Sequence, residues 1–312
     1  MKRMKIGMLG LLIAFFWIGG IHAQQKVVRI LAIGNSFSQD AVEQNLHELA
    51  AADGFTAVIG NLFIGGCSLE RHVKNARNDT SVYAYRKIGM GGKKVERRNV
   101  SLAQALADEQ WDYVSLQQAS SFSGMYATYA ASLPELVSYV KERIPRKTKL
   151  MLHQTWAYAA SASHSGFRNY DNDQLTMYHA IVEAVKKAGR LAKIKIIIPS
   201  GTAIQNMRTS FVGDHMNRDG FHLNLTTGRY TAACTWYEKI FKRKVVGNPY
   251  APQGMSEEER KVAQQAAHKA VLHPGKITEM SGKYSGTAVT FATGIEYLCV
   301  GDSPMRLYSI DE

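Results

Sequence analysis

The feature that most constrains this chain is a regular alternation of short apolar segments with amphipathic ones. Continuous apolar runs are typical of strands buried on both faces, and they predict strands at 27–33, 56–64, 111–116, 149–153 and 194–198. Helical spacing of apolar residues predicts helices at 40–51, 101–108, 133–142, 174–188 and 223–241. Because strands that alternate with helices pair in parallel, the sequence predicts an α/β fold whose central parallel sheet has helices on both faces.

The first 23 residues differ from this pattern. Three basic residues precede an apolar run at 6–21, and the segment ends in Ile-His-Ala. This layout predicts a secretory signal peptide cleaved after Ala23. An uncleaved membrane anchor is the alternative, but the run is short for a bilayer span. We therefore expect an exported protein, periplasmic or extracellular, that is soluble after cleavage and not stably inserted in a membrane.

The remaining chain shows no internal repeat and no low-complexity linker. We expect one α/β domain at 24–252, closed by a proline-containing segment, and a C-terminal region of unassigned role at 253–312. In that region, Ser256 is expected to cap a charged helix that runs to Val271. The tail beyond it is rich in Gly, Ser and Thr, and its alternating stretches at 286–291 and 297–300 leave a small hairpin and a loose tail as alternatives.

Charge and cysteine content exclude some classes of protein. The formal net charge is +12, and it falls to +9 when the three basic residues of the signal peptide are removed. The basic residues are scattered and form no nucleic-acid-binding motif, so nucleic acid is not an expected partner. An acidic polysaccharide or an anionic surface fits the charge, as does a plain solvated basic face. Three cysteines without a CxxC motif favour buried free thiols over a disulfide framework, although one bridge stays open.

Two distant segments carry residues suited to covalent catalysis. Ser36 follows the first predicted strand in the sequence Gly-Asn-Ser, and Asp219 and His222 lie three residues apart in Arg-Asp-Gly-Phe-His. A serine that leaves a buried strand on a tight turn exposes its hydroxyl, a histidine can act as its base, and an aspartate can orient the histidine. In isolation, Asn35 and Ser36 would only cap the next helix, with Ser38 the better cap, and Asp-Gly would be an ordinary turn.

A metal site is the main alternative at the second segment. Nitrogen and oxygen ligands crowd there, namely Asp214, His215, Asp219 and His222. They lie on one short loop, and no remote set of Asp, Glu or His completes them. We therefore favour the nucleophile, base and carboxylate arrangement, and expect neither a metal nor another cofactor.

The two segments together resemble those of a known superfamily. Ile-Gly-Asn-Ser-Phe-Ser and Asp-Gly-Phe-His are similar to motifs of the SGNH (GDSL-type) hydrolases, and more closely to a family of exported bacterial proteins within that superfamily. The resemblance implies a flavodoxin-like three-layer sandwich that hydrolyses esters through an acyl-serine, with Ser36, Asp219 and His222 as the triad. The matching stretches are 33–40, 60–72, 111–121, 153–160, 199–210 and 218–237.

The resemblance also implies an oxyanion hole with three donors, and this chain differs from the superfamily pattern at one of them. The N–H groups of Ser36 and Gly66 match two of the donors, with Gly65 a near rival for the second. The third donor, an asparagine in Gly-x-Asn, is replaced by a pair of glutamines. We expect Gln118 to supply the missing amide donor, with Gln117 as the alternative; both could instead only satisfy buried backbone groups.

The expected substrate is an ester of a carbohydrate. Gln117, His153 and Trp156 are weak candidates for substrate binding, because aromatic rings beside polar groups suit a sugar face, although Trp156 fits a core position equally well. Exported relatives in the superfamily often remove acetyl groups from carbohydrates, so carbohydrate O-acetyl esterase is the first expectation. A lipase or thioesterase, and a carbohydrate-binding protein with weak catalysis, remain open alternatives. The sugar, the acyl group and the oligomeric state stay undetermined.

Overall fold

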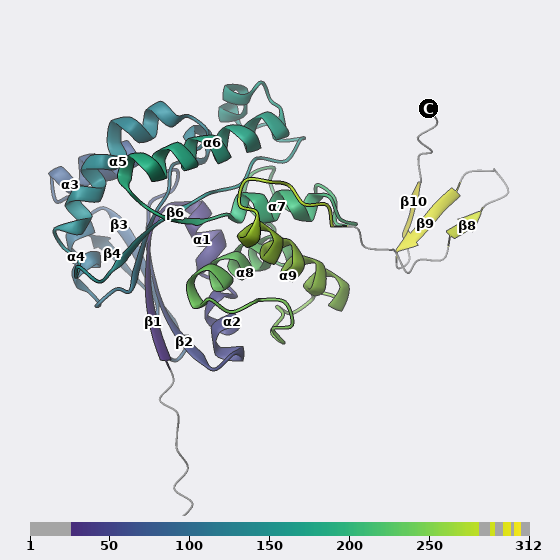
Figure 1. Cartoon of the computed structure of the whole chain (residues 1–312), viewed down its shortest axis with the longest axis horizontal. Coiled ribbons are helices and arrows are strands. Elements are labelled where there is room, and N and C mark those ends of the chain that lie inside the picture. Colours follow the sequence, from purple (N-terminus) through teal and green to yellow (C-terminus); the bar gives the residue numbers. More distant parts are fainter. Residues whose placement is uncertain (1–25, 281–287, 291–295, 301–302, 307–312) are drawn as a thin grey trace, which may run out of the picture.

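A computed structural model of the chain describes residues 26–280, 288–290, 296–300 and 303–306. The expected signal peptide lies outside the described residues. Residues 26–280 form a seven-stranded sheet between two layers of helices (Figure 1). The strands are β1 (Lys26–Gly34), β2 (Phe55–Phe63), β3 (Tyr83–Ile88), β4 (Lys94–Val100), β5 (Tyr113–Leu116), β6 (Lys149–His153) and β7 (Ile196–Ile198).

Five strands form the parallel part of the sheet, in the order β2-β1-β5-β6-β7. This is the strand order of doubly wound, flavodoxin-like folds, the fold class that the resemblance implied. β2 lies on one side of β1, and the chain then crosses to the other side of β1, where it adds β5, β6 and β7. The strand order therefore reverses between β1 and β5. Ligands of such sheets bind outside the carboxyl ends of the strands at this reversal. Ile33 pairs with Leu116 there, which brings the segments after the two strands together.

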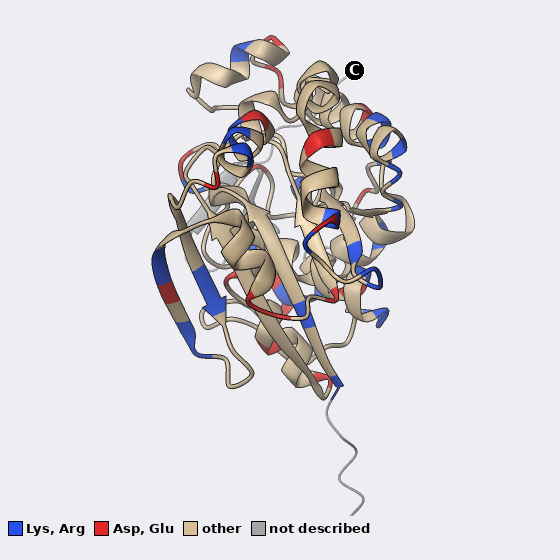
Figure 2. Ribbon diagram, turned by 90° about the vertical axis from the view of Figure 1, so that its left-hand side faces the viewer, with Lys and Arg blue, Asp and Glu red and all other residues tan. Residues whose placement is uncertain are grey.

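The other two strands correct the expectation of an all-parallel sheet. β3 pairs antiparallel with β2, and β4 pairs antiparallel with β3, so a hairpin extends one edge. Its strands did not show as apolar runs because β4, Lys-Val-Glu-Arg-Arg-Asn-Val, is almost wholly exposed. Figure 2 shows basic and acidic residues along this left-hand edge. Charged residues on an edge strand oppose further pairing with other chains.

Helices cover both faces of the sheet (Figure 1). One layer contains α3 (Leu69–Arg77), α4 (Leu102–Ala107), α5 (Tyr126–Lys141) and α6 (Gln174–Ala192). The other contains α1 (Ser36–Val42), α2 (Leu46–Ala52), α7 (Ser200–Arg208), α8 (Thr227–Phe241) and α9 (Glu257–Leu272). Two short 3-10 helices, η1 (Ser120–Phe122) and η2 (Ser165–Tyr170), lie in the loops after β5 and β6. The core between the layers includes the fully buried side chains of Trp111, Trp156 and Trp236.

The first helical segment differs from the expectation in two respects. The single helix expected at 40–51 is two helices, and the break lies at Asn45, whose φ of 68° is a left-handed conformation that ends regular helix geometry. The cap of α1 is Asn35, whose side chain accepts the N–H of Phe37, and not Ser38. α3 and α7 were not expected from the sequence.

The packed unit continues past the expected boundary at residue 252. Ser256 caps α9 through a capping box with Glu259, as the sequence predicted for its start. The helix buries a face of alanines against α7 and α8, and Asn206 on α7 donates a hydrogen bond to the carbonyl of Ala266. Further along, the N–H of Met280 donates to Thr209, so residues up to 280 belong to the same unit.

The tail contains a second, three-stranded antiparallel sheet. Its strands are β8 (Ala288–Thr290), β9 (Glu296–Val300) and β10 (Ser303–Arg306), in the order β10-β9-β8. Of the expected thiols, Cys67 and Cys234 are free and buried. Over the part of the chain that the structure describes, no helix is both long and apolar enough to cross a bilayer.

Candidate active site

Ser36 lies at the carboxyl edge of the sheet, where parallel α/β folds place their sites. It is the first residue of α1 and follows β1 after a single residue, Asn35. The N–H groups in the first turn of a helix have no acceptor within the helix, so the Ser36 N–H is suited to the donor role implied for it. The next residue, Phe37, is buried and packs against the second segment of the site.

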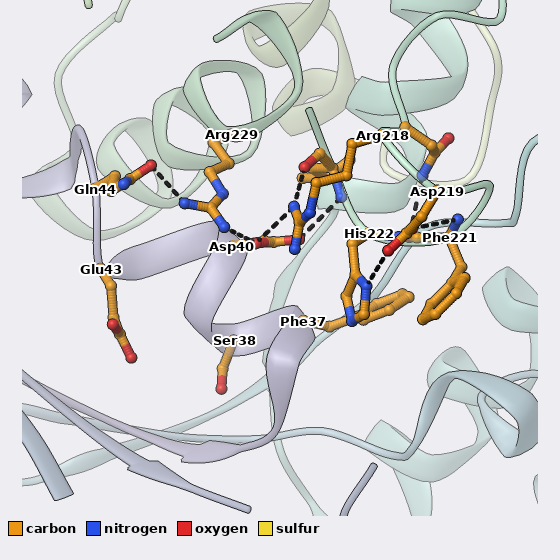
Figure 3. Close-up of polar contacts among 12 residues, drawn as sticks. Phe37, Ser38, Asp40, Glu43, Gln44, Arg218, Asp219, Phe221, His222 and Arg229 are labelled. Carbon is orange, nitrogen blue, oxygen red and sulfur yellow. Dashed lines mark hydrogen bonds and ion pairs between the residues drawn. The ribbon is translucent and has the colours of Figure 1, made fainter. Parts of the chain in front are cut away.

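Asp219 and His222 contact each other directly. They belong to the triad loop, residues 218–223, which lies between α7 and α8 (Figure 3). The Nδ1 atom of His222 lies 2.7 Å from Oδ2 of Asp219. The other carboxylate oxygen, Oδ1, accepts the N–H groups of Phe221 and His222, which fixes the carboxylate within the loop.

This pairing determines the proton positions on the histidine. Partial burial acts to raise the pKa of Asp219, but hydrogen bonds from the His222 ring and from two backbone N–H groups outweigh it and lower that pKa below its ordinary value. The carboxylate is therefore ionised at neutral pH and only accepts hydrogen bonds. Nδ1 of a neutral His222 then carries the proton, and Nε2 has the free lone pair that a general base needs.

Contacts of Phe37 connect the two halves of the site. The ring of Phe37 stacks on Trp156 at 4.3 Å and meets the ring of His222 edge-on at 6.0 Å. The indole N–H of Trp156 donates to the carbonyl of Phe221 at 2.8 Å. The residue beside Ser36 is thus packed against His222, which brings the three predicted triad residues into one region of the structure.

Trp156 and His153 are not placed to touch a substrate, which corrects that expectation. Trp156 is fully buried and His153 is 1% exposed. Trp156 stacks on Phe37, the residue after Ser36, and His153 packs edge-on against Trp156. Both therefore support the Ser36 segment from within the core. Burial lowers the pKa of His153 to about 3, so its ring is neutral at physiological pH.

Gln117 is likewise buried, and it continues this support. Its amide nitrogen donates to Oδ1 of Asn35 at 2.8 Å, and its oxygen accepts the Nδ1 proton of His153 at 2.8 Å. Asn35 in turn donates from Nδ2 to the carbonyl of Cys67 at 3.0 Å. These bonds form a chain of donors from His153 through Gln117 and Asn35 to the backbone of Cys67. Gln117 is therefore a support of the Ser36 segment and not a substrate contact.

The same chain brings the expected oxyanion glycine near Ser36. Gly66 directly precedes Cys67, whose carbonyl the Asn35 side chain holds. Its φ of +61° is in the left-handed region, where glycine is favoured, and an added Cβ would meet no atom within 4 Å. Gly66 is therefore exposed beside the segment that carries Ser36, and its donor role stays a prediction.

Gln118 has both ends of its amide engaged within the fold. The oxygen accepts the N–H groups of Leu69 and Ala119, at 2.9 and 2.8 Å. The nitrogen donates to the hydroxyl of Thr128 on α5 at 3.0 Å. These contacts match the alternative in which the glutamine satisfies buried backbone groups, so the oxyanion role of Gln118 stays a prediction that competes with a structural one.

The four candidate metal ligands do not converge. The carboxylate of Asp214 accepts from the backbone of Ala160 and from Gln174, and it forms an ion pair with Arg208 at 2.8 Å. Across residues 26–280 and the described tail strands, no group of three or more His, Cys, Asp or Glu side chains is arranged to hold a metal ion. The donors around Asp214 are those of a structural carboxylate.

One contact of the site was missed from the sequence. Asp40, on α1, forms ion pairs with Arg218 in the triad loop and with Arg229 on α8 (Figure 3). The available signal in the sequence was an acidic residue four positions after Ser36. Its partners lie about 180 residues away and could not be inferred from spacing.

Comparisons with known proteins place this geometry in a family. A model described as "Domain of unknown function (DUF4886)" matches residues 29–270. A crystal structure of a DUF4886 family protein from Bacteroides uniformis ATCC 8492 is 63% identical, with a TM-score of 0.81, and the match covers 82% of this chain and 98% of that one. No curated protein matches the chain significantly.

More distant solved structures are similar to this chain at lower TM-scores. A protein from Slackia heliotrinireducens, proposed to be an SGNH hydrolase, is 22% identical with a TM-score of 0.47, and the match covers 69% of this chain and 99% of that one. The acetylxylan esterase Axe2 from Geobacillus stearothermophilus is 12% identical with a TM-score of 0.45, over 69% and 95% of the two chains. The chain therefore belongs to the DUF4886 family.

Proposed function

We propose that the protein is a serine esterase that works through an acyl-serine intermediate, and that its substrate is an O-acetylated carbohydrate. The observation that carries the proposal is the 2.7 Å contact between His222 and Asp219, packed against Phe37 beside Ser36. This contact gives the histidine the tautomer and the fixed orientation that activation of a serine requires.

The acylation step follows from these positions. The Oγ atom of Ser36 attacks the ester carbonyl carbon while Nε2 of His222 takes the hydroxyl proton. Asp219 stabilises the imidazolium that forms, and the N–H groups of Ser36 and Gly66 bind the developing oxyanion. The intermediate collapses, the carbon–oxygen bond to the alcohol breaks, and the alcohol leaves with the proton from His222.

Deacylation repeats these roles with water. His222 takes a proton from a water molecule whose oxygen attacks the acyl-serine carbonyl. The second tetrahedral intermediate collapses, the bond to Oγ of Ser36 breaks, and His222 returns the proton to that oxygen. The products are the free hydroxyl of the sugar and acetic acid, and the enzyme is regenerated.

A surface groove beside the site supports a carbohydrate substrate over a long-chain acyl ester. The groove has a volume of about 930 Å³ and runs between α3 and α5. It begins at Ser68 and Gln118, next to the Gly66 segment. Nine of its thirteen lining residues are polar or charged, including Arg71 and Lys74, and Phe122 offers an exposed ring. A groove that combines charged side chains, apolar surface and one aromatic ring fits sugar units, whereas a fatty acyl chain needs a channel that is apolar throughout.

The first experiment tests the nucleophile with a short activated acetyl ester. The Ser36→Ala variant should lose nearly all hydrolysis while its circular dichroism and thermal unfolding stay like those of the wild type. Ser81→Ala, at an exposed position between α3 and β3, is the matched control and should keep full activity. A serine-directed phosphonate should label Ser36 alone. Substantial turnover by Ser36→Ala would refute Ser36 as the nucleophile and with it the acyl-serine mechanism.

A second experiment tests the substrate class. Acetate release should be compared between acetylated oligosaccharides and the small activated ester, for the wild type and for Phe122→Ala. We expect the variant to raise KM for the oligosaccharides and to leave the small ester unaffected, because only the longer substrate reaches the groove. Equal effects on both substrates, or faster hydrolysis of long-chain acyl esters, would contradict the carbohydrate proposal.

A further inference from the structure

A single buried carboxylate joins the helix that begins with Ser36 to the triad loop. Asp40 is 0% exposed and lies four residues after Ser36, which places the two on the same side of α1. It pairs with Arg218 at 3.2 Å and with Arg229 at 2.6 Å. Its Oδ2 atom also accepts the backbone N–H of Leu223 at 2.9 Å. Three donors from the C-terminal half of the chain therefore meet on one side chain of α1.

These contacts hold both ends of the triad loop (Figure 3). Arg218 comes just before the Asp–His pair, and Leu223 comes just after it. The loop is also closed on itself, because the Arg218 N–H donates to the carbonyl of His222 at 2.9 Å and the Arg218 guanidinium donates to the carbonyl of Leu223. The loop thus forms a compact unit, and the carboxylate of Asp40 attaches that unit to α1.

The energetics favour a positional role for this carboxylate. A buried ion pair adds little net stability compared with a well-packed apolar pair, because the charges lose their hydration. The ion pair instead fixes the relative position of the groups that it joins, because hydrogen bonds between a carboxylate and charged donors are directional. The Phe37 and Trp156 rings also hold α1 near the triad loop. Apolar contacts of this kind allow the loop to slide along α1, whereas a set of charged hydrogen bonds does not. A shift of the loop along α1 would change the distance between Ser36 and His222.

We propose that Asp40 is a positioning residue that sets the placement of His222 relative to Ser36. It acts through Arg218 and Leu223 and does not touch the substrate. The proposal rests on the proposed esterase function for its kinetic consequence, although the attachment of the loop to α1 can be measured without any activity.

The test compares Asp40→Asn with Glu43→Gln. Glu43 is a matched control because it caps the same helix, its side chain is 3% exposed, and it pairs with Arg86 and Lys94, each at 3.2 Å, away from the triad loop. Both variants replace a buried carboxylate by the amide of equal size. Arg218→Gln is the second variant, used in case Asp40→Asn does not fold, because Arg218 is about one-third exposed and its loss leaves Arg229 on Asp40.

Two readouts are measured for each folded variant. The first is amide hydrogen exchange of the peptide that covers residues 218–223, relative to peptides from β1 and β6. The second is hydrolysis of a short activated acetyl ester. For Asp40→Asn we expect faster exchange confined to the triad loop and a fall in kcat of about 10²-fold with little change in KM, since a displacement of about 1 Å in a catalytic group can cost that much. Arg218→Gln should change both readouts in the same direction, and Glu43→Gln should change neither.

The outcomes separate this proposal from the proposed function. Wild-type protection of the loop in Asp40→Asn, or a kcat within about threefold of that of Glu43→Gln, would overturn the positioning role. Exchange that rises equally in every peptide would also overturn it, because that result shows a general loss of stability. If the wild type hydrolyses no ester while the loop still loosens in Asp40→Asn, the esterase function fails and the attachment of the loop to α1 stands.

Discussion

Replacing Asn35 by aspartate would restore the Gly-Asp-Ser sequence typical of the superfamily, and the structure predicts that this change is harmful here. Asn35 is 1% exposed, and its Nδ2 atom donates to the carbonyl of Cys67 at 3.0 Å. Its Oδ1 atom accepts from Phe37 and from Gln117. An ionised carboxylate would keep the two accepted bonds, but it would set an oxygen against the Cys67 carbonyl in a buried site.

The size of the effect follows from the pKa of the introduced carboxyl group. Full burial raises a carboxyl pKa by about 3–5 units, and the two accepted hydrogen bonds offset part of this. A net rise of about 2.5 units corresponds to about 3.4 kcal/mol, at 1.36 kcal/mol per unit. Below about pH 3, about one unit under the unfolded-state pKa of Asp, the carboxyl group is mostly protonated in both states, so the loss is small. As the pH rises, the unfolded state ionises first, so the variant loses stability until the pH exceeds the raised folded-state pKa.

The assay is urea unfolding of wild type and Asn35→Asp at two pH values. We expect the free energy of unfolding of the variant to be about 1 kcal/mol lower at pH 4.5 and about 3 kcal/mol lower at pH 7.5. The exposed Asn172 provides the control, since Asn172→Asp should show no comparable gap. A gap that does not grow with pH, or equal stability at pH 7.5, would refute the reasoning and show that the segment beside Cys67 accommodates the charge.

Three further predictions concern Gln118, Gly201 and metals. Gln118→Ala should lower the free energy of unfolding by about 2 kcal/mol, because two backbone N–H groups lose their acceptor. The same variant should change kcat by less than tenfold, whereas a kcat loss of about 10²–10³ would identify Gln118 as an oxyanion donor. Gly201→Ala should lower the melting temperature and destabilise by about 3 kcal/mol or more, because its Cβ would lie 2.1 Å from the backbone oxygen of Thr155; an unchanged melting temperature would show that α7 can move aside. Extensive EDTA treatment should leave esterase activity unchanged, and activity lost on chelation and recovered with zinc would favour a metal at the Asp214 loop.

The parts of the fold that the sequence predicted are those encoded in local patterns. β6 was expected at 149–153 and is found there, and α6 begins at Gln174 as expected. β6 is a continuous apolar run, and α6 buries residues at helical spacing, so both patterns can be recognised without their neighbours. β4 was missed for the same reason, because its exposed, charged residues show no apolar pattern and its strand conformation depends on pairing with β3.

In the candidate site, too, the sequence revealed the features that depend on neighbouring residues and did not reveal those that depend on tertiary contacts. The residue types and order of Ser36, Asp219 and His222 were visible in the sequence, and the 2.7 Å contact between the last two joins residues only three apart. The directions of buried side chains were not visible. Gln117 faces Asn35 and His153, whereas Gln118 faces α3 and α5, because neighbouring positions at the end of a strand lie on opposite faces of the sheet.

The sequence by itself thus determined the class of fold, the order of most of its elements and the residue types of the candidate triad, because periodicity and motif depend on residues close together in the chain. Only the tertiary structure decided which polar groups are buried and what they hold. Asp40 meets Arg218 and Arg229 across about 180 residues, and Trp156 is fully covered by Phe37 and its neighbours. Such contacts depend on how helices and strands pack, and packing brings together positions whose separation along the chain carries no signal.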